Sequence, residues 1–411
     1  MNSRRIPKRI KQFLATLGLQ AQLFKHLKDP RRAKGKQWSF ELLVYLFFTG
    51  ALLQCASLAE LERLSESIGE RLPDSTLAYT LERINPAPIR KVLRDGVRSM
   101  LRSKTLTPKT LPFGVIAIDG KTSWVGGHQG DREAQKQDGR YNLRWMRAVL
   151  TSAPSRPCID QDVIPAATNE MGYFATFWDA MMRAYSRTNL FRLVTLDAGY
   201  SSKENARIID DSGVGYVLRI KGEQPTLLQE LKRVLTPTRA PDATSKWESN
   251  KGRQEQRRLF RSNEVADYDG WTHLRQGWLV QTVVRHKNMC EEVVMERYFI
   301  SNMLWNSLNP AQILLVVRGH WAIENDCNWT MDVVWKEDTT AWATNAKENP
   351  RHQPLRTLSW LRLLAYNVLG WLRSVRLRSR PKWSALRLVL YRLLCPLPTA
   401  LEKELALAPL G

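Results

Sequence analysis

Residues 193–200 have the sequence LVTLDAGY, in which a short apolar run is followed directly by an acid. Residues 115–120, VIAIDG, repeat this arrangement. A short apolar run bounded by polar or glycine positions is typical of a buried strand. Asp119 and Asp197 would then follow the ends of two strands, and that edge of an open α/β sheet is where ligands bind. Each Asp could merely cap a turn, but a buried carboxylate stays charged only with a partner such as a cation.

Two further apolar runs, at residues 148–150 and 216–220, also predict strands. Helical patterns at residues 173–185 and 203–211 lie between the runs, and the second of these ends near Gly213. Strands that alternate with helices favour an α/β fold with a partly parallel sheet.

The rest of the chain has other patterns. Residues 1–110 have helical apolar spacing, and residues 222–315 contain strand-like alternation that predicts a β-rich insertion. A helix with Ile313, Val316 and Trp321 on its apolar face follows the insertion. The predicted organisation is a helical N-terminal DNA-binding domain (1–110), a first part of the α/β core (111–221), the β-rich insertion (222–315), a second part of the core (316–370) and a basic helical tail (371–411).

Two segments of the N-terminal region each allow two interpretations. Helices predicted at residues 57–68 and 74–84 could form a helix-turn-helix, but two core helices joined by a turn explain the spacing equally well. The apolar run at residues 40–56 contains Glu41 and Gln54 and is barely long enough to span a membrane. We therefore expect a buried core helix there.

The charge of the chain indicates a polyanionic partner. There are 62 Lys and Arg against 40 Asp and Glu, which gives a net charge of +22 and a pI near 10. The excess lies at both ends, because residues 1–38 hold eleven basic and one acidic residue and residues 351–411 hold eleven and two. Nucleic acid is the commonest such partner, since each neutralised phosphate releases counterions. A charge that only keeps the protein in solution is the alternative.

The spacing of the cysteines indicates the kind of cellular compartment in which the protein works. The five cysteines are scattered and form no CxxC pair, so neither a disulfide framework nor a zinc knuckle is expected. No apolar signal core follows the basic N-terminus directly. We expect a cytoplasmic protein with no membrane partner.

Glu324 supplies a third carboxylate. It lies in RGHWAIEN at residues 318–325, where Trp321 and Ile323 provide apolar packing. Mg²⁺ prefers oxygen ligands and keeps several waters, so three carboxylates and substrate phosphate oxygens suffice for two ions.

Other catalytic motifs are incomplete. Gly120-Lys121-Thr122 resembles the end of a phosphate-binding loop, but the glycine that this motif requires is replaced by Val115, so no nucleotide cofactor is expected. The sequence contains neither HExxH nor GxSxG, which excludes the corresponding zinc and serine hydrolases.

Four segments together carry a family resemblance. They are AIDGKT at 117–122, VTLDAGY at 194–200, YVLRIKGEQ at 216–224, and HWAIEN at 320–325 with its continuation to Asp338. The set resembles bacterial insertion-sequence transposases, in particular the H-repeat-associated group within the insertion-sequence-four type of DDE transposases. This resemblance implies a ribonuclease-H-like fold of retroviral-integrase type, with a β-strand insertion between the second Asp and the Glu. The separation of 127 positions between Asp197 and Glu324 leaves room for that insertion.

The resemblance also implies an activity. Asp119, Asp197 and Glu324 would be the catalytic residues and would bind two Mg²⁺ ions, for which Mn²⁺ is expected to substitute. The enzyme would cleave DNA at the inverted repeats of a transposon and join the ends to target DNA, as a homodimer when DNA is bound. The expected DNA contacts are Lys121, Lys221, Arg318, His320, Lys336, Arg373, Arg376, Arg378 and Arg380.

The chain departs from the wider family around Glu324. The family has Tyr, Arg and Lys at positions that are Val317, His320 and Met331 here, so the resemblance does not extend to the hairpin intermediate that this signature supports. Trp271 and Trp278 are candidates for stacking on a flipped base, with core packing as the alternative. A nuclease of the same fold and a domesticated DNA-binding protein are the rival functions.

Overall fold

A computed structural model describes most of the chain. The described residues are 8–19, 23–32, 36–69, 71–125, 131, 133–250, 252–271, 273–286, 292–339, 342, 353–377 and 379–395. The chain divides into two compact units. We call Met1–Gly96, Ser123–Leu143 and Trp329–Gly411 the helical unit, and Val97–Thr122 and Arg144–Asn328 the sheet unit.

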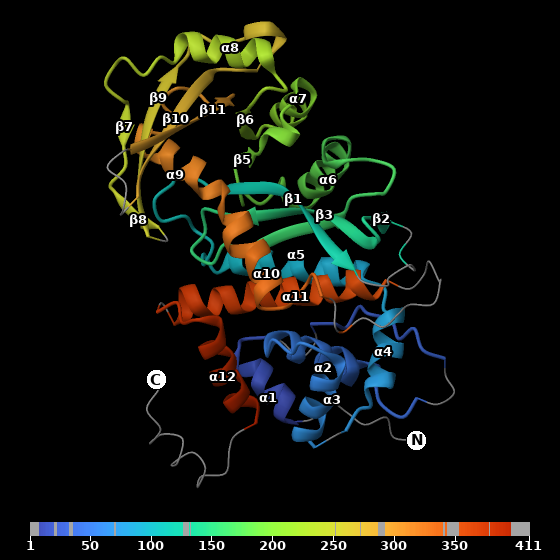
Figure 1. The fold of residues 1–411 in the computed structure, drawn as a ribbon. Coiled ribbons are helices and arrows are strands. Elements are labelled where there is room, and N and C mark those ends of the chain that lie inside the picture. The colour runs from blue at the N-terminus through green and yellow to red at the C-terminus, as the bar shows by residue number, and fades with distance from the viewer. Residues whose placement is uncertain are drawn as a thin grey trace. The chain divides into compact units, whose positions relative to one another are not determined.

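The helical unit combines helices from both ends of the chain (Figure 1). The N-terminal helices are α1 (Lys8–Thr16), α2 (Phe40–Leu52), α3 (Leu58–Ser67), α4 (Asp74–Arg83) and the first part of α5 (Ala87–Arg102). The C-terminal ones are α10 (Trp329–Val333), α11 (Pro354–Trp371), the π-helical η4 (Leu372–Arg376) and α12 (Trp383–Leu394). Since α2 packs against α11, this unit joins segments that the sequence analysis assigned to separate domains.

Helix α2 forms the core of this unit. Eleven of its thirteen residues are buried, and the Ser39 side chain caps it by accepting the Leu42 N–H. Trp335 donates its indole N–H to the Ala51 carbonyl at 2.7 Å, and Trp342 donates to the Cys55 carbonyl at 2.9 Å. The prediction of a buried core helix is confirmed. No described helix has the length and apolar character needed to cross a membrane.

In the described residues, eleven strands form one sheet in the order β2-β3-β1-β5-β6-β11-β10-β9-β7, with β4 on β3 and β8 on β9. The strands are β1 (Val115–Val125), β2 (Gln135–Gln137), β3 (Arg140–Leu150), β4 (Cys158–Val163), β5 (Leu193–Leu196), β6 (Gly215–Ile220), β7 (Ala243–Thr244), β8 (Glu248–Asn250), β9 (Arg253–Ser262), β10 (Gln276–His286) and β11 (Glu292–Ser301). Strands β1, β5 and β6 are parallel, whereas β11, β10 and β9 are antiparallel. A mixed α/β fold is therefore confirmed.

Helices cover both faces of this sheet (Figure 1). The helices of the sheet unit are α6 (Glu170–Tyr185), α7 (Lys203–Asp211), α8 (Pro225–Val234) and α9 (Pro310–His320). Helix α9 buries Ile313 and Val316 in a cluster with Trp278. Helix α8 lies against β10, where a side chain at Gly277 would collide with Leu231. This sheet positions the candidate site.

Several elements differ from the sequence prediction. The strand expected at residues 148–150 is the end of β3, which begins at Arg140. Strand β1 was expected to end at Ile118 but continues to Val125, because it remains beside β3 after its pairing with β5 has ended. The segment 222–315 begins with helix α8 before the strands β7 to β11. Helices α3 and α4 occupy the two predicted segments, as both interpretations require, so a helix-turn-helix and its DNA-binding role stay predictions.

Candidate functional site

Asp119 and Asp197 lie on neighbouring parallel strands. The register of β1 and β5 pairs Ile118 with Leu196, and the two acids are the next residues on each strand. Adjacent strands are about 4.8 Å apart, so the backbones at the two acids are close. Strand β5 ends here, and its chain turns into the short helix η1 (Ala198–Tyr200). Asp119 therefore lies within β1 rather than after it, yet at the edge where the parallel pairing ends.

Asp119 has too little positive charge around it to remain ionised at neutral pH. Burial and the negative charge of Glu324 raise its pKa to about 8, and Glu170 and Asp197 add to this effect. The N–H of Gly120 donates to its Oδ1 at 2.9 Å and opposes the shift. A positive charge brought to this carboxyl would restore its ionised form.

Asp197 is in the opposite electrostatic situation. Arg219 Nη1 lies 3.1 Å from Oδ1, and Lys221 Nζ lies 3.5 Å from Oδ2. Burial raises the pKa of Asp197, but the Ala198 N–H and the Arg219 charge outweigh it and leave the pKa below its ordinary value. Asp197 is therefore the carboxylate of the pair that stays charged.

Glu324 is carried by a π-helical turn (η3, Ile323–Asn328) that follows α9. Such wide turns are rare and often occur at functional sites. The turn is anchored by buried Ile323 and by buried Arg147, whose Nη1 donates to Asn328 Oδ1 at 3.1 Å. Burial and the charge of Asp197 raise the pKa of Glu324, while Arg219 opposes this shift.

The donor set suits a hard divalent cation. Glu324 and Asp197, from distant parts of the sequence, are near enough to raise the pKa of Asp119, and a cation bound here would favour the ionised form of all three carboxyls. As the side chains stand, no three His, Cys, Asp or Glu residues among the described ones are close enough to share one ion. A cation would draw these carboxylates together and replace the contact of Asp197 with Arg219.

A family comparison decides the classification. The sequence profile described as a transposase DDE domain matches residues 111–367, more than half of the chain and the whole segment that contains the three carboxylates. The chain is a member of the transposase DDE domain family. This result confirms the resemblance inferred from the four sequence segments.

Individual relatives of this DDE domain are distant. The putative transposase YncI of Escherichia coli O157:H7 is 27% identical over 265 residues, which are 62% of this chain and 61% of that protein. The H repeat-associated putative transposase YhhI of Escherichia coli K12 is 27% identical over 160 residues, 36% of this chain and 41% of that protein. The chain thus matches less than two thirds of each relative's length.

A solved structure also resembles the chain. It is the cryo-EM structure of a piggyBac transposase synaptic complex with hairpin DNA. The TM-score is 0.46 at 12% sequence identity, and the alignment covers 98% of this chain and 79% of that chain.

The predicted DNA contacts in the sheet unit have other partners in this structure. Lys121 is buried, and Lys221 faces Asp197. Arg318 forms an ion pair with Glu248 of β8. Burial lowers the pKa of His320 to about 4, so its ring, which is hydrogen-bonded to Thr195, carries no charge for a phosphate at neutral pH. Roles of these residues in DNA binding stay predictions.

The remaining predicted contacts lie in the helical unit. Lys336 is exposed, whereas Arg373 donates to the Pro381 carbonyl at 2.8 Å and lies over the Trp383 ring. Arg376 donates to the Thr16 carbonyl, and Arg380 is exposed. Arg378 lies outside the described residues. Arg373 and Arg376 therefore have structural contacts in the helical unit.

The departures from the family signature lie within the segment that matches the DDE domain. Val317 and Met331 are buried apolar residues, which explains why charged or phenolic groups are absent at those positions. Trp271 and Trp278 are also buried, and Trp278 donates to Gln276, so neither can stack on a DNA base without leaving the core. That stacking hypothesis was wrong. Trp305, over whose ring Arg261 lies at 3.9 Å, is more exposed than Trp271 and Trp278.

Sequence inspection missed Glu170, Tyr200 and Arg219 as parts of the site. Arg219 lies in β6, which neighbours β5, so the predicted strand already placed it one strand away from Asp197. Glu170 begins α6, and no sequence motif connects it with Asp119. Only the folded chain brings it to the site.

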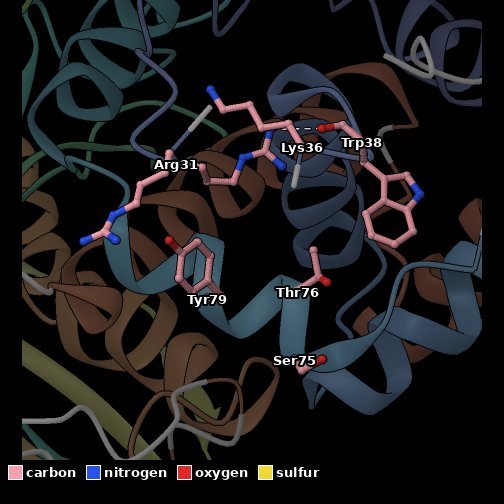
Figure 2. Close-up of a pocket in the computed structure, with 7 residues that line it drawn as sticks. Arg31, Lys36, Trp38, Ser75, Thr76 and Tyr79 are labelled. Atoms are coloured by element: carbon pink, nitrogen blue, oxygen red, sulfur yellow. Dashed lines mark hydrogen bonds between the residues drawn. The ribbon is translucent and has the colours of Figure 1, made fainter. Parts of the chain in front are cut away.

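A second feature is a basic pocket in the helical unit. It has a volume of about 260 Å³ and is lined by Arg31, Arg32, Lys36, Trp38, Ser75, Thr76 and Tyr79. Figure 2 shows the basic segment on one side and helix α4 on the other. Asp29 bonds Arg31 and Lys36, each at 2.9 Å, whereas Arg32 forms no ion pair with another described residue. The pocket therefore keeps a positive excess.

Proposed function

We propose that this protein is a DNA transposase that cleaves the ends of a mobile element and joins them to target DNA. The observation that carries the proposal is the approach of Asp119, Asp197 and Glu324 at one edge of the sheet, within a segment of the DDE family. The names of the relatives, putative transposases, support the same activity.

The proposed fold of the catalytic part is ribonuclease-H-like. Strand β1 lies between β3 and β5 and carries the first acid, β5 is followed by the second, and a helical turn beyond β11 carries the third. The strands β7 to β11 separate the second acid from the third, as the insertion predicted from sequence requires.

In the proposed site the three carboxylates bind two Mg²⁺ ions, with Mn²⁺ as a substitute. Bound ions of this kind activate the attacking hydroxyl and neutralise the charge that develops on the leaving oxygen. The protein contributes position, because β1 and β5 hold two carboxylates side by side. It also contributes positive charge, because Arg219 and Lys221, which now contact Asp197, would bind a phosphate when released from it.

The proposed DNA surface includes the basic pocket of the helical unit. Arg31, Arg32 and Lys36 face α4, the second helix of the predicted helix-turn-helix. The hydroxyls of Ser75 and Thr76 and the half-exposed Tyr79 complete a lining that fits a phosphate of the DNA backbone. Because two element ends must be brought together, we propose a homodimer in the DNA-bound state.

Substitution of the carboxylates tests this function. Asp119→Asn, Asp197→Asn and Glu324→Gln should each reduce Mg²⁺-dependent DNA cleavage by at least 1,000-fold, because each removes a negative charge from the cation site. DNA affinity in a gel-shift assay without metal should remain within a few-fold of the wild type. The exposed acid Asp179, which is paired with Arg183 on α6, provides the control Asp179→Asn. A carboxylate variant that cleaves DNA as fast as this control would remove that residue from the site.

A further inference from the structure

Glu170 lies near the candidate site on α6, a helix that carries none of the three proposed ligands. It is the first residue of α6, just after Asn169, whose side chain caps the helix by accepting the Gly172 N–H at 2.9 Å. A negative charge is favourable at this end of a helix, and that alone could explain a Glu here. The contacts of its carboxylate, however, are with another segment.

That segment is the backbone next to Asp119. A Cβ atom placed on Gly120 would lie 1.8 Å from Glu170 Oε1 and 2.3 Å from its Cδ. The carboxylate therefore occupies the space that any side chain at position 120 would need. Glycine at this position lets a fourth acid approach the residue that follows Asp119.

Tyr200 provides an independent sign that this space is built for a ligand. Its side chain is 1% exposed and packs edge-on to Phe174, yet its hydroxyl has no hydrogen-bond partner at normal geometry. A buried hydroxyl without a partner costs free energy that Phe would avoid. Burial raises the pKa of Tyr200 most, the charges of Glu170, Asp119 and Asp197 add to this shift, and Glu170 is the acceptor within reach of its hydroxyl.

No basic side chain neutralises Glu170. Among the described residues it forms no ion pair, and Arg144, the nearest influence that lowers its pKa, donates instead to the carbonyls of Pro165 and Thr168. Three acids thus lie near one phenol, while the basic side chains paired with these acids in the described part of the chain, Arg219 and Lys221, are on Asp197. A divalent cation would satisfy the carboxylates, and the Tyr200 hydroxyl would donate to a carboxylate oxygen.

We propose that Glu170 is a fourth carboxylate of the cation site, admitted by Gly120 and oriented by the Tyr200 hydroxyl. The proposal rests on the function proposed above and extends its set of metal ligands. Glu170 would bind a cation directly or through a metal-bound water, and Tyr200 would be a positioning residue that holds the Glu170 carboxylate toward Asp119.

Calorimetric titration of the whole protein with Mn²⁺ at fixed pH tests this assignment without measuring catalysis. Glu170→Gln should raise the Kd for Mn²⁺ about 10- to 100-fold, and Tyr200→Phe several-fold, since such changes near a metal typically have these effects. The control Asp179→Asn, on the same helix and exposed, should leave the Kd unchanged. Circular dichroism verifies that each variant is folded.

Gly120→Ala provides the sharper arm of the experiment. The clash is with the flexible end of Glu170, so the variant should fold while pushing that carboxylate away from Asp119. As a single change, Gly120→Ala should weaken Mn²⁺ binding. In the double variant with Glu170→Gln, it should weaken binding little beyond the effect of Glu170→Gln alone. The assignment of Glu170 is overturned if the effects of the two changes on Mn²⁺ binding are additive. It is also overturned if Glu170→Gln binds Mn²⁺ within twofold of the wild type while Asp119→Asn does not bind it. In both cases the three-carboxylate site stands. A wild-type protein that binds no Mn²⁺ would overturn both proposals.

Discussion

At the scale of single residues, His320 connects the site with the stability of the fold. Burial lowers its pKa from 6.5 to about 4, and its Nδ1 is 2.9 Å from the Thr195 hydroxyl on β5. Between these two pKa values the unfolded chain binds a proton that the folded chain does not. The stability that His320 contributes is therefore present above about pH 6.5 and is lost as the pH falls toward 4.

The variant His320→Gln should remove this pH dependence. Its free energy of unfolding should fall less between pH 7 and pH 4.5 than that of the wild type, by up to about 3 kcal/mol, because glutamine does not titrate. Urea unfolding at both pH values, followed by tryptophan fluorescence, measures the difference. Equal pH dependence in the two proteins would show that His320 is protonated as easily in the folded state as in the unfolded one.

Some residues of the candidate site could be predicted from the sequence and others could not. Asp119 and Asp197 were predictable because each follows a buried apolar run that marks a strand, and parallel strands end at a common edge. Glu170 and Tyr200 were not, since their roles depend on contacts with a glycine and with acids that are distant in sequence. Proximity of this kind is not encoded in any local pattern.

At the scale of elements, α2 and the turn after it depend on Trp335 and Trp342, which follow Glu324 in the sequence. Trp335 is 1% exposed, donates to the Ala51 carbonyl, and packs edge-on to Trp383 at 5.5 Å between ring centroids. Trp335→Ala should reduce the free energy of unfolding of the helical unit by about 3–5 kcal/mol, because it leaves a cavity and an unpaired carbonyl.

Trp329 on α10 is the matched control for this change. Its side chain is 52% exposed, so Trp329→Ala should change stability by less than about 0.5 kcal/mol. Urea titrations followed by circular dichroism compare the two variants. Equal losses would mean that the packing of α2 does not depend on Trp335.

Helix α4 and the basic pocket carry the next prediction. Arg32 is exposed and has no ion pair among the described residues, so Arg32→Gln removes charge without breaking a structural contact. It should weaken DNA binding and reduce the slope of log K against log salt by about 1, as expected for one lost phosphate contact. Fluorescence anisotropy at several salt concentrations measures the slope.

The exposed Lys232, at the end of α8, provides the control for net charge. Lys232→Gln should leave the salt slope unchanged if the pocket is the phosphate site. The same reduction in both variants would show that binding depends on net charge and not on this pocket.

The elements themselves were predicted unevenly. Helix α7 and strand β5 were predicted with their observed bounds, because their apolar pattern is sharp and polar or glycine residues bound them. Strand β1 was predicted too short, since its second half is held by β3 rather than by apolar burial. The π-helical turn that carries Glu324 has no sequence signal distinct from that of an α-helix.

At the scale of the whole molecule, the chain combines a DDE-family segment with a strongly basic remainder. The net charge of +22 is concentrated toward both termini, whereas Asp119 and Asp197 lie where the pairing of β1 with β5 ends. The α/β class and the family could be inferred from sequence. The grouping of N-terminal and C-terminal helices in one unit could not, because it depends on contacts between segments some 300 residues apart.

Cleavage followed by joining is the central claim, and one assay tests it most directly. Labelled DNA carrying the inverted repeats that flank the coding region is incubated with the protein, Mg²⁺ and a supercoiled target plasmid. We expect the wild type to join labelled 3′ ends covalently to the plasmid, with no joined product from Asp119→Asn and none without a divalent cation. Cut DNA without joined products would show a nuclease instead, and joining by Asp119→Asn at the wild-type rate would contradict the proposed catalytic site.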